Sequence, residues 1–259
     1  MNHVDVHIHL EQGDYSLHWV NEFVKVAAEK NLDEIWLLEH CYQFREFVPM
    51  YDSVCAYSKY IDKWFRKKAG TRHFDDYLRL QESVQRTNFP IKIKFGLEIC
   101  YFQKFERFIF ENTKDKGLDF LVGSVHFIDD FAFDHKPEHW QGIDVDRMYR
   151  RYFETSIDLA QSGIFDGIAH PDLIKIFGHT SSFSLDEYYK NLAASLSKNN
   201  MYAEQNSGAY RRSPETAPLG MNPGLIREMK LHGVKILTAS DAHCPEDVGL
   251  RIKEMETLL

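Results

Sequence analysis

The stretch VDVHIHLEQGDYS, residues 4–16, begins as an apolar run typical of a buried β-strand, yet it contains two histidines, His7 and His9. Because alternate side chains of a strand share a face, Asp5, His7 and His9 are expected to point one way and the intervening apolar residues the other. The run holds no other polar residue that would mark a solvent-exposed face. The stretch therefore predicts a buried first strand that presents polar groups to a ligand.

Composition indicates a large globular protein without a general polyanion-binding surface. The 259 residues are 44% hydrophobic and 14% aromatic, and the net charge of -8 argues against nucleic-acid or anionic-membrane binding. The four cysteines form no C-x-x-C pair, so we expect reduced thiols in a cytoplasmic protein. We see no signal-peptide pattern and no apolar run of the roughly 18 residues that a membrane helix needs.

Seven short apolar stretches alternate with segments whose apolar residues recur at three- and four-residue spacing, the pattern of amphipathic helices. This alternation along the whole chain predicts parallel strands joined by right-handed crossovers. Seven such units favour an α/β fold in which the sheet is a closed or nearly closed barrel. The expected strands are 3–9, 34–39, 91–98, 119–125, 164–169, 201–205 and 234–240.

Two segments interrupt the regular alternation. Residues 41–90 are typical of a largely helical insertion, and residues 127–144, FIDDFAFDHKPEHWQGID, are too long for an ordinary connection. Long loops in compact domains are often functional. Because the chain has no repeat, low-complexity tract or linker, we predict one domain over residues 1–259 that carries the insertion.

Histidines and carboxylates gather where the expected strands end. In a parallel barrel the C-terminal strand ends open onto one face, where active sites are built. One such histidine alone is usually a hydrogen-bonded structural residue, but eight groups of this kind are expected to converge. They are His7, His9, His40, Glu98, His126, His170, Asp241 and His243.

The converging set predicts a metal centre. Six histidines and two acids buried without partners would carry a large desolvation cost, and a protonated cluster would repel itself. Neutral imidazoles and carboxylates are standard ligands of divalent cations, which remove both problems. Eight ligands exceed the need of one ion with an open position, so we expect two or three ions of zinc, iron or manganese, bridged by Glu98 or Asp241. Closely spaced ions support phosphoryl transfer and generate hydroxide at neutral pH.

The motifs that carry these groups also resemble a known family. VDVHIH at the start, GLE at 96–98, GSVHF at 123–127, AHPDLIK at 169–175 and SDAH at 240–243 are similar to those of the polymerase and histidinol phosphatase (PHP) superfamily. Within it, the loop IDDFAFDH and the motif EQNSG at 204–208 resemble the histidinol-phosphate phosphatases. The resemblance implies a distorted (β/α)7 barrel, a trinuclear metal centre at the C-terminal strand ends and hydrolysis of a phosphate monoester.

The resemblance implies a distribution of ligands over three ions. Glu98 would be shared between the first and third ions, and the second ion would take one more ligand close behind the H-x-H motif. Asp14 is favoured over Glu11 for that place, because its DYS context looks like the family's segment. The expected sets are His7, His9, Glu98 and Asp241, then His40, His243 and Asp14, then His126, His170 and Glu98.

The resemblance also implies residues that act on the substrate. Arg211, which follows EQNSG, is expected to bind phosphate oxygens bidentately and to stabilise charge in the transition state. Asp241 and His243 complete the expected catalytic set. Asn206 and Ser207 are expected to donate hydrogen bonds to the phosphate or to form the turn.

The implied activity is hydrolysis of L-histidinol phosphate to L-histidinol and phosphate, a step of histidine biosynthesis, with a small-molecule substrate and neither nucleic acid nor membrane as partner. Phe131, Phe133, Asp134 and the 41–90 insertion would cover that substrate, as a lid or through an acid that pairs with its amine. Three alternatives stay open: a PHP phosphoesterase for another small phosphate monoester or nucleotide, a non-catalytic PHP module, and an amidohydrolase, which usually needs a strand-end lysine. No oligomeric state is predicted.

Overall fold

Seven parallel strands form one sheet, in the order β1-β2-β3-β4-β7-β8-β9, in the computed structural model, which describes residues 3–259. Each apolar stretch predicted as a strand overlaps one of them. The strands are β1 (Val4–His9), β2 (Glu34–Leu38), β3 (Lys92–Cys100), β4 (Phe120–Ser124), β7 (Gly167–Ile168), β8 (Tyr202–Asn206) and β9 (Ile236–Ala239).

The sheet is nearly closed between its first and last strands. The backbone N–H of His9 donates to the carbonyl of Ala242 (2.8 Å), and the N–H of Ala242 donates to the carbonyl of His7 (3.2 Å). The hydroxyl of Thr238 donates to the carbonyl of Val4 (2.7 Å). These bonds join β1 to the chain around β9, and the predicted barrel is thereby confirmed.

Asp5 has a structural role, although its face of the strand was expected to present it to a ligand. Its carboxylate accepts hydrogen bonds from the backbone N–H groups of Ser240 and Gly249, at 2.8 Å each. Burial raises the pKa of Asp5 to about 6. The pairing of β1 with β2 shifts register between Asp5 and Ile8. Asp5 therefore anchors the chain that follows β9.

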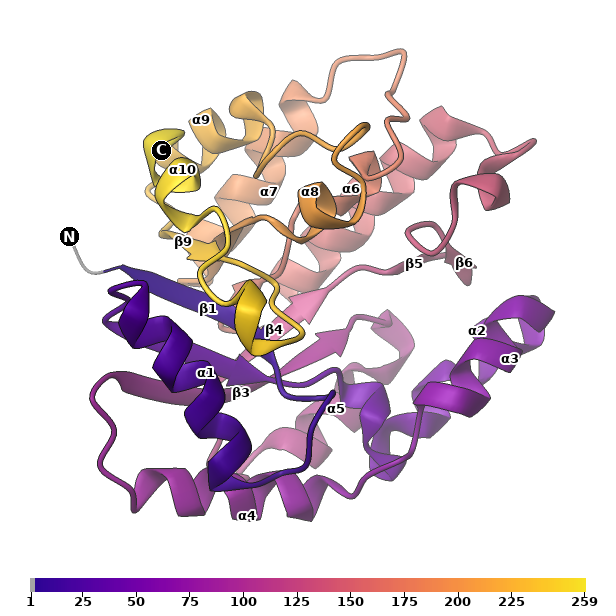
Figure 1. Cartoon of the computed structure of the whole chain (residues 1–259). Coiled ribbons are helices and arrows are strands. Elements are labelled where there is room, and N and C mark those ends of the chain that lie inside the picture. Colours follow the sequence, from indigo (N-terminus) through magenta and orange to yellow (C-terminus); the bar gives the residue numbers. More distant parts are fainter. Residues whose placement is uncertain (1–2) are drawn as a thin grey trace.

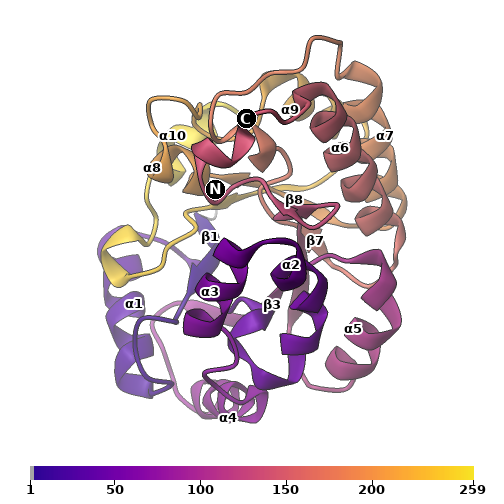
Figure 2. The same ribbon diagram turned by 90° about the vertical axis from the view of Figure 1, so that its right-hand side faces the viewer.

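Helices surround the sheet, with α1 and α4 on one side of it and α6, α7 and α9 on the other (Figures 1 and 2). The helices are α1 (Leu17–Glu29), α2 (Asp52–Tyr57), α3 (Lys59–Lys68), α4 (Phe74–Gln85), α5 (Glu106–Thr113), α6 (Val145–Gln161), α7 (Asp186–Lys198), α8 (Gly208–Arg212), α9 (Pro223–Leu231) and α10 (Ile252–Thr257). No helix within residues 3–259 is long and apolar enough to cross a membrane.

The first helix shows how local sequence fixes these elements. The hydroxyl of Ser16 accepts a hydrogen bond from the N–H of Trp19 and caps the first turn of α1, which satisfies a donor that the helix leaves free. Val20, Phe23 and Ala27 follow at helical spacing and are all buried in the main core. The helical spacing of apolar residues expected between the strands is found here, although Leu17 at the start of α1 is exposed.

Aromatic rings fill the barrel interior beneath the strand ends. Trp36 and Phe120 pack with ring centroids 4.6 Å apart, and Tyr202 meets Trp36 edge-on at 5.3 Å. Glycines on neighbouring strands make room for them: a Cβ at Gly96 would lie 2.4 Å from the ring of Phe120, and one at Gly167 would lie 2.3 Å from that of Tyr202. The packed interior gives the strand-end side chains a rigid floor.

The two irregular segments lie beside each other at the open end of the barrel. Residues 41–90 form short 3-10 helices, η1 (Cys41–Gln43) and η2 (Arg45–Tyr51), and then α2, α3 and α4. Residues 127–144 form a small antiparallel pair, β5 (Phe127–Ile128) and β6 (Phe131–Ala132), and η4 (Pro137–Trp140). One core cluster runs from Ile8 to Met255 and includes both segments. It supports the single-domain organisation, which stays a prediction.

Candidate active site

Four potential ligand groups converge at the end of the first strand. The Nε2 atoms of His7 and His9 lie 3.0 Å apart. Oε2 of Glu98, from β3, lies 3.4 Å and 3.5 Å from these two nitrogens. Oδ1 of Asp241, just after β9, lies 3.6 Å and 3.7 Å from them. Residues from three strand ends thus meet around one point, as the sequence predicted.

These atoms fit a divalent cation. Nδ1 of His7 faces Glu204 at 2.9 Å and donates to it, so Nε2 of the neutral ring carries a lone pair. Oε2 of Glu98 is buried and accepts no hydrogen bond. Two ligand atoms that each lie about 2.1 Å from one ion are separated by roughly 3 to 3.5 Å, which is close to the separations observed. A cation here would compensate the two buried carboxylates and use both ring lone pairs.

Two further groups adjoin the first and share members with it. Nδ1 of His40 lies 2.6 Å from Oε2 of Glu98, whereas Oε1 of Glu98 faces Nε2 of His126 (3.0 Å) and of His170 (3.3 Å). The two oxygens of Glu98 therefore face different histidines, as a bridging carboxylate would. In each of three sets, the ligand atoms of the three residues all lie within 4.8 Å of one another. The sets are His9, His40 and His243; His7, His9 and Glu98; and His40, Glu98 and His126.

The electrostatics keep the two carboxylates and His9 in the protonation states that ligands need. Neighbouring carboxylates outweigh burial and raise the pKa of His7, His126 and His243, so a cation that binds these three histidines displaces a proton from each. Burial by itself raises the pKa of Glu98, but the charges of His40 and His7 outweigh it and hold this pKa well below its usual range. The pKa of Asp241 is likewise depressed, because His7 and the other histidines around it more than offset its burial. Burial, with the charges of His40 and His243, holds the pKa of His9 well below its usual value. Ionised carboxylates and a neutral His9 result.

Backbone strain is concentrated at two of the predicted ligands. His170 has a φ of 30° and Asp241 a φ of 57°, in a region that non-glycine residues seldom occupy. Such conformations persist only where the surrounding structure holds them, and they cluster at functional sites. The strain accords with the site that the ligand geometry defines.

Glu11, and not Asp14, lies at the site. Oε1 of Glu11 faces Nδ1 of His243 at 2.9 Å, and its other oxygen accepts from Gln43 (2.9 Å). Burial alone would raise the pKa of Glu11, but the hydrogen bond from His243 and nearby histidine charges lower it to about 2. Asp14 is exposed and accepts a hydrogen bond from Ser16 at the start of α1. We therefore propose Glu11, in place of the expected Asp14, as the additional ligand.

This choice leads to a paired prediction. Glu11→Gln is expected to weaken binding of at least one metal ion by about tenfold or more, because His243 then faces a neutral amide in place of the Glu11 carboxylate. Asp14→Asn, a substitution of the same chemical kind three residues away, is expected to leave metal affinity unchanged. Competition with a chromogenic chelator measures both. Weakened binding in Asp14→Asn with normal binding in Glu11→Gln would contradict the assignment.

The polar atoms of Asn206 and Ser207 are used within the protein. Nδ2 of Asn206 donates to Glu204 (2.9 Å), and its Oδ1 accepts from the N–H of Gly208 (2.7 Å). The hydroxyl of Ser207 is fully buried and lies 3.1 Å from each of two backbone carbonyls. Their expected hydrogen bonds to phosphate are therefore replaced by structural roles in the turn.

Sequence reasoning missed two residues that position the ligands. Glu204 is fully buried and accepts from Nδ1 of His7 (2.9 Å) and from the N–H of His170 (3.3 Å). A Cβ at Gly208 would lie 1.9 Å from Oδ2 of Asp241, so only glycine allows this close approach. Glu204 was detectable, because an acid inside a buried apolar strand needs a partner.

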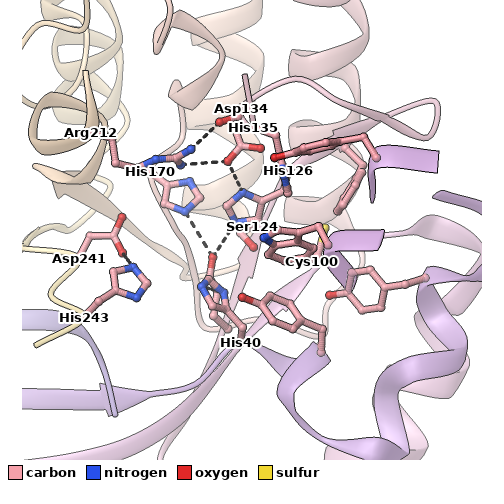
Figure 3. Close-up of a pocket in the computed structure, with 16 residues that line it drawn as sticks. His40, Cys100, Ser124, His126, Asp134, His135, His170, Arg212, Asp241 and His243 are labelled. Atoms are coloured by element: carbon pink, nitrogen blue, oxygen red, sulfur yellow. Dashed lines mark hydrogen bonds and ion pairs between the residues drawn. The ribbon is translucent and has the colours of Figure 1, made fainter. Parts of the chain in front are cut away.

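Arg212, and not Arg211, lines the cavity. The guanidinium of Arg211 donates to the carbonyl of Asp241 (3.1 Å) and pairs with Asp247 (3.4 Å). Arg212 follows it on the short helix α8 and reaches Asp134 (3.1 Å) on the cavity side (Figure 3). We therefore propose Arg212, in place of Arg211, for the expected phosphate-binding role.

The site opens into a cavity of about 320 Å³. Asp241 and His243, the other residues of the expected catalytic set, line it together with Glu98. The facing wall is aromatic and comes mainly from the inserted segment: Tyr42, Tyr51, Tyr60, Trp64 and Phe127. Phe131 and Phe133, which were expected to cover the substrate, are buried among other rings and do not line this cavity.

A nearly closed parallel barrel with a histidine- and carboxylate-rich site at its strand ends is the architecture of a metal-dependent barrel enzyme. A model of the PHP domain matches residues 3–208. The chain belongs to the PHP domain family, as its motifs indicated.

Known relatives cover most of the chain. A Deinococcus radiodurans protein named "Probable histidinol-phosphatase" is 25% identical over 255 residues, which are 96% of this chain and 90% of the relative. A Schizosaccharomyces pombe protein of the same name is 28% identical over 192 residues, 68% of this chain and 62% of the relative. The crystal structure of a Lactococcus lactis histidinol phosphate phosphatase, complexed with zinc, L-histidinol and phosphate, matches with a TM-score of 0.70 at 22% identity and covers 99% of this chain and 92% of that one.

Proposed function

We propose that this protein is a metal-dependent histidinol-phosphatase, a phosphoric monoester hydrolase that converts L-histidinol phosphate to L-histidinol and phosphate. The observation that carries the proposal is one cavity in which strand-end metal ligands, Arg212 and an aromatic wall face one another. The two curated relatives are named for this activity. In this role the protein would act in histidine biosynthesis. Its cytoplasmic location stays a prediction.

The ligand groups would hold two or three divalent ions, for which zinc, iron and manganese all suit mixed imidazole and carboxylate ligation. Such ions, when bound, supply a nucleophile from water at neutral pH and neutralise charge on phosphoryl oxygens. The protein's own part is to aim the ligands. Glu204 turns Nε2 of His7 toward the site, and Glu98 extends one oxygen to each side of it.

Arg212 would bind the phosphate from the cavity that it shares with the metal ligands. A guanidinium presents up to five N–H donors, of which Asp134 takes only part. Its remaining donors can meet phosphate oxygens bidentately. The distribution of negative charge over these oxygens changes as the ester bond breaks. The guanidinium of Arg212, which is already in place, can stabilise the charge of the transition state without having to move.

The aromatic wall suits a substrate whose alcohol carries a flat ring. Trp64 lies edge-on to His135 with centroids 4.8 Å apart, and Tyr60, also on α3, lies edge-on to the same histidine at 6.0 Å. An imidazole ring placed among these side chains would gain aromatic contacts. A small aliphatic phosphate ester would leave this wall uncovered, so the wall favours histidinol phosphate over such esters.

The proposal is tested by phosphate release from L-histidinol phosphate, glycerol 3-phosphate and a nucleoside monophosphate, before and after metal removal with a chelator. We expect the highest kcat/KM for L-histidinol phosphate, loss of turnover on chelation and recovery when zinc, iron or manganese is returned. A higher kcat/KM for either other ester would contradict the substrate. Turnover that survives complete metal removal would contradict the metal dependence.

A further inference from the structure

Asp134 contacts both a predicted metal ligand, His126, and the arginine that lines the cavity, Arg212. It follows β6 in the loop that crosses the open end of the barrel, and its side chain is almost fully buried. Oδ2 of Asp134 accepts from Nδ1 of His126 (3.1 Å) and from Nη1 of Arg212 (3.1 Å). The backbone carbonyl of Asp134 accepts from Nη2 of Arg212. Figure 3 shows the chain of contacts from Arg212 through Asp134 to His126.

The first contact fixes which nitrogen of His126 can bind a metal. With Nδ1 donating to Asp134, the neutral ring leaves its lone pair on Nε2, which lies 3.0 Å from Oε1 of Glu98. Carboxylates that accept from the outer nitrogen of a histidine set both its tautomer and its orientation. Asp134 thus orients His126 so that its Nε2 faces Glu98, the carboxylate member of the third expected ligand set.

The second contact holds a long side chain that would otherwise be mobile. The side chain of Arg212 is 38% exposed, and free arginine side chains have many rotamers. Two hydrogen bonds to Asp134, one to the carboxylate and one to the carbonyl, hold one edge of the guanidinium. The other edge is left for a ligand in the cavity that Arg212 lines.

We propose that Asp134 is a positioning residue that sets the metal ligand His126 and the phosphate-binding Arg212 at a fixed separation. The inference rests on the proposed function for the role of Arg212, but not for the role of His126. His126 follows β4 in one part of the barrel, and Arg212 ends α8 in another. Through one carboxylate, metal binding and phosphate binding are held to a common geometry.

The test variant is Asp134→Asn, with Asp129→Asn as its matched control in the same loop. Asp129 is exposed and pairs with Arg151 on α6, away from the cavity. The amide that replaces the Asp134 carboxylate cannot keep every present contact, because one of its two polar atoms is itself a donor and it carries no charge. We expect Asp134→Asn to lower the affinity for the most weakly held metal ion by about ten- to a hundred-fold, measured by chelator competition. Asp129→Asn is expected to bind metal as the wild type does.

The second readout is binding of inorganic phosphate to the metal-loaded protein by calorimetry, which needs no turnover. Asp134→Asn is expected to bind phosphate more weakly. Combined with Arg212→Met, it should weaken phosphate binding no further than Arg212→Met alone, because both changes remove the same contact. Its effect on metal affinity should persist in that double variant. Failure of the proposed substrate would leave both binding readouts intact.

Normal metal and phosphate binding by folded Asp134→Asn would overturn the proposal, and so would additive losses of phosphate binding in the double variant. If Asp134→Asn shows no cooperative thermal unfolding, Asp134→Ser takes its place. The shorter side chain of that variant withdraws the acceptor from both partners and leaves the loop less crowded, so the same losses are expected. Normal binding by a folded Asp134→Ser would equally contradict the role.

Discussion

Glu98→Gln is expected to abolish nearly all phosphatase activity while leaving the protein folded. An amide keeps one oxygen but replaces the other with an NH2 donor, and both oxygens of Glu98 face histidine nitrogens of the site. Loss of a bridging carboxylate weakens ion binding on both sides, and metal ions contribute several kcal/mol to such reactions, so kcat/KM should fall by about a thousand-fold or more.

Exposed Glu111 provides the control for this variant. It pairs with Arg107 on the surface of α5, so Glu111→Gln should leave both rate and metal content unchanged. Metal content, circular dichroism and initial rates are measured on the three proteins side by side. A folded Glu98→Gln protein that keeps its full metal content and more than about a tenth of the wild-type rate would contradict the bridging role.

Arg212→Met and Arg211→Met are expected to differ strongly, although the two residues are neighbours. Arg212 lines the cavity, whereas Arg211 is engaged by Asp247 and a backbone carbonyl. Removal of one preplaced donor to a reacting oxyanion costs about a hundred- to a thousand-fold in rate, which is the loss expected in kcat/KM for Arg212→Met. Arg211→Met should lose far less.

The comparison of the two arginine variants needs both kinetic constants and a stability check. Arg212 would contact phosphate in the ground state as well as in the transition state, so we expect KM to rise and kcat to fall together. Thermal unfolding shows whether a loss of activity in Arg211→Met comes from lower stability, because this substitution removes the buried contacts of Arg211. A larger fall in kcat/KM for the folded Arg211→Met protein would return the phosphate-binding role to Arg211.

Most of the fold was predictable because burial leaves a periodic trace in the sequence. The seven strands are apolar runs between amphipathic helices, and their parallel order follows from that alternation. The convergence of His7, Glu98 and Asp241, which are far apart in sequence, followed from one further rule, that parallel strand ends share a face. These inferences depend on element order and not on side-chain detail.

Side-chain direction in the loops was not predictable from the same information. Adjacent residues of a helix point about 100° apart, so Arg211 and Arg212 face different neighbours, and only the placement of α8 decides which one enters the cavity. Glu11 and Asp14 both follow the H-x-H motif at short range. Asp14 accepts a hydrogen bond from Ser16 at the start of α1, whereas Glu11 lies beside His243.

Asp134 and Glu204 belong to the same class of residue. Each acts through a histidine, and each contact joins segments that are distant or irregular in the sequence. Glu204 reaches His7 across the barrel, a separation of 197 residues. The orientation of ligands therefore depends on tertiary packing that motif spacing does not encode.

Anomalous diffraction from crystals of the metal-loaded protein, recorded at the absorption edge of the bound metal, tests the central claim most directly. We predict one peak in contact with His7, His9, Glu98 and Asp241, and at least one more on the other side of Glu98 in contact with His126 and His170. Peaks confined to surface histidines, or none at these strand ends in protein that turns over its substrate, would contradict the account.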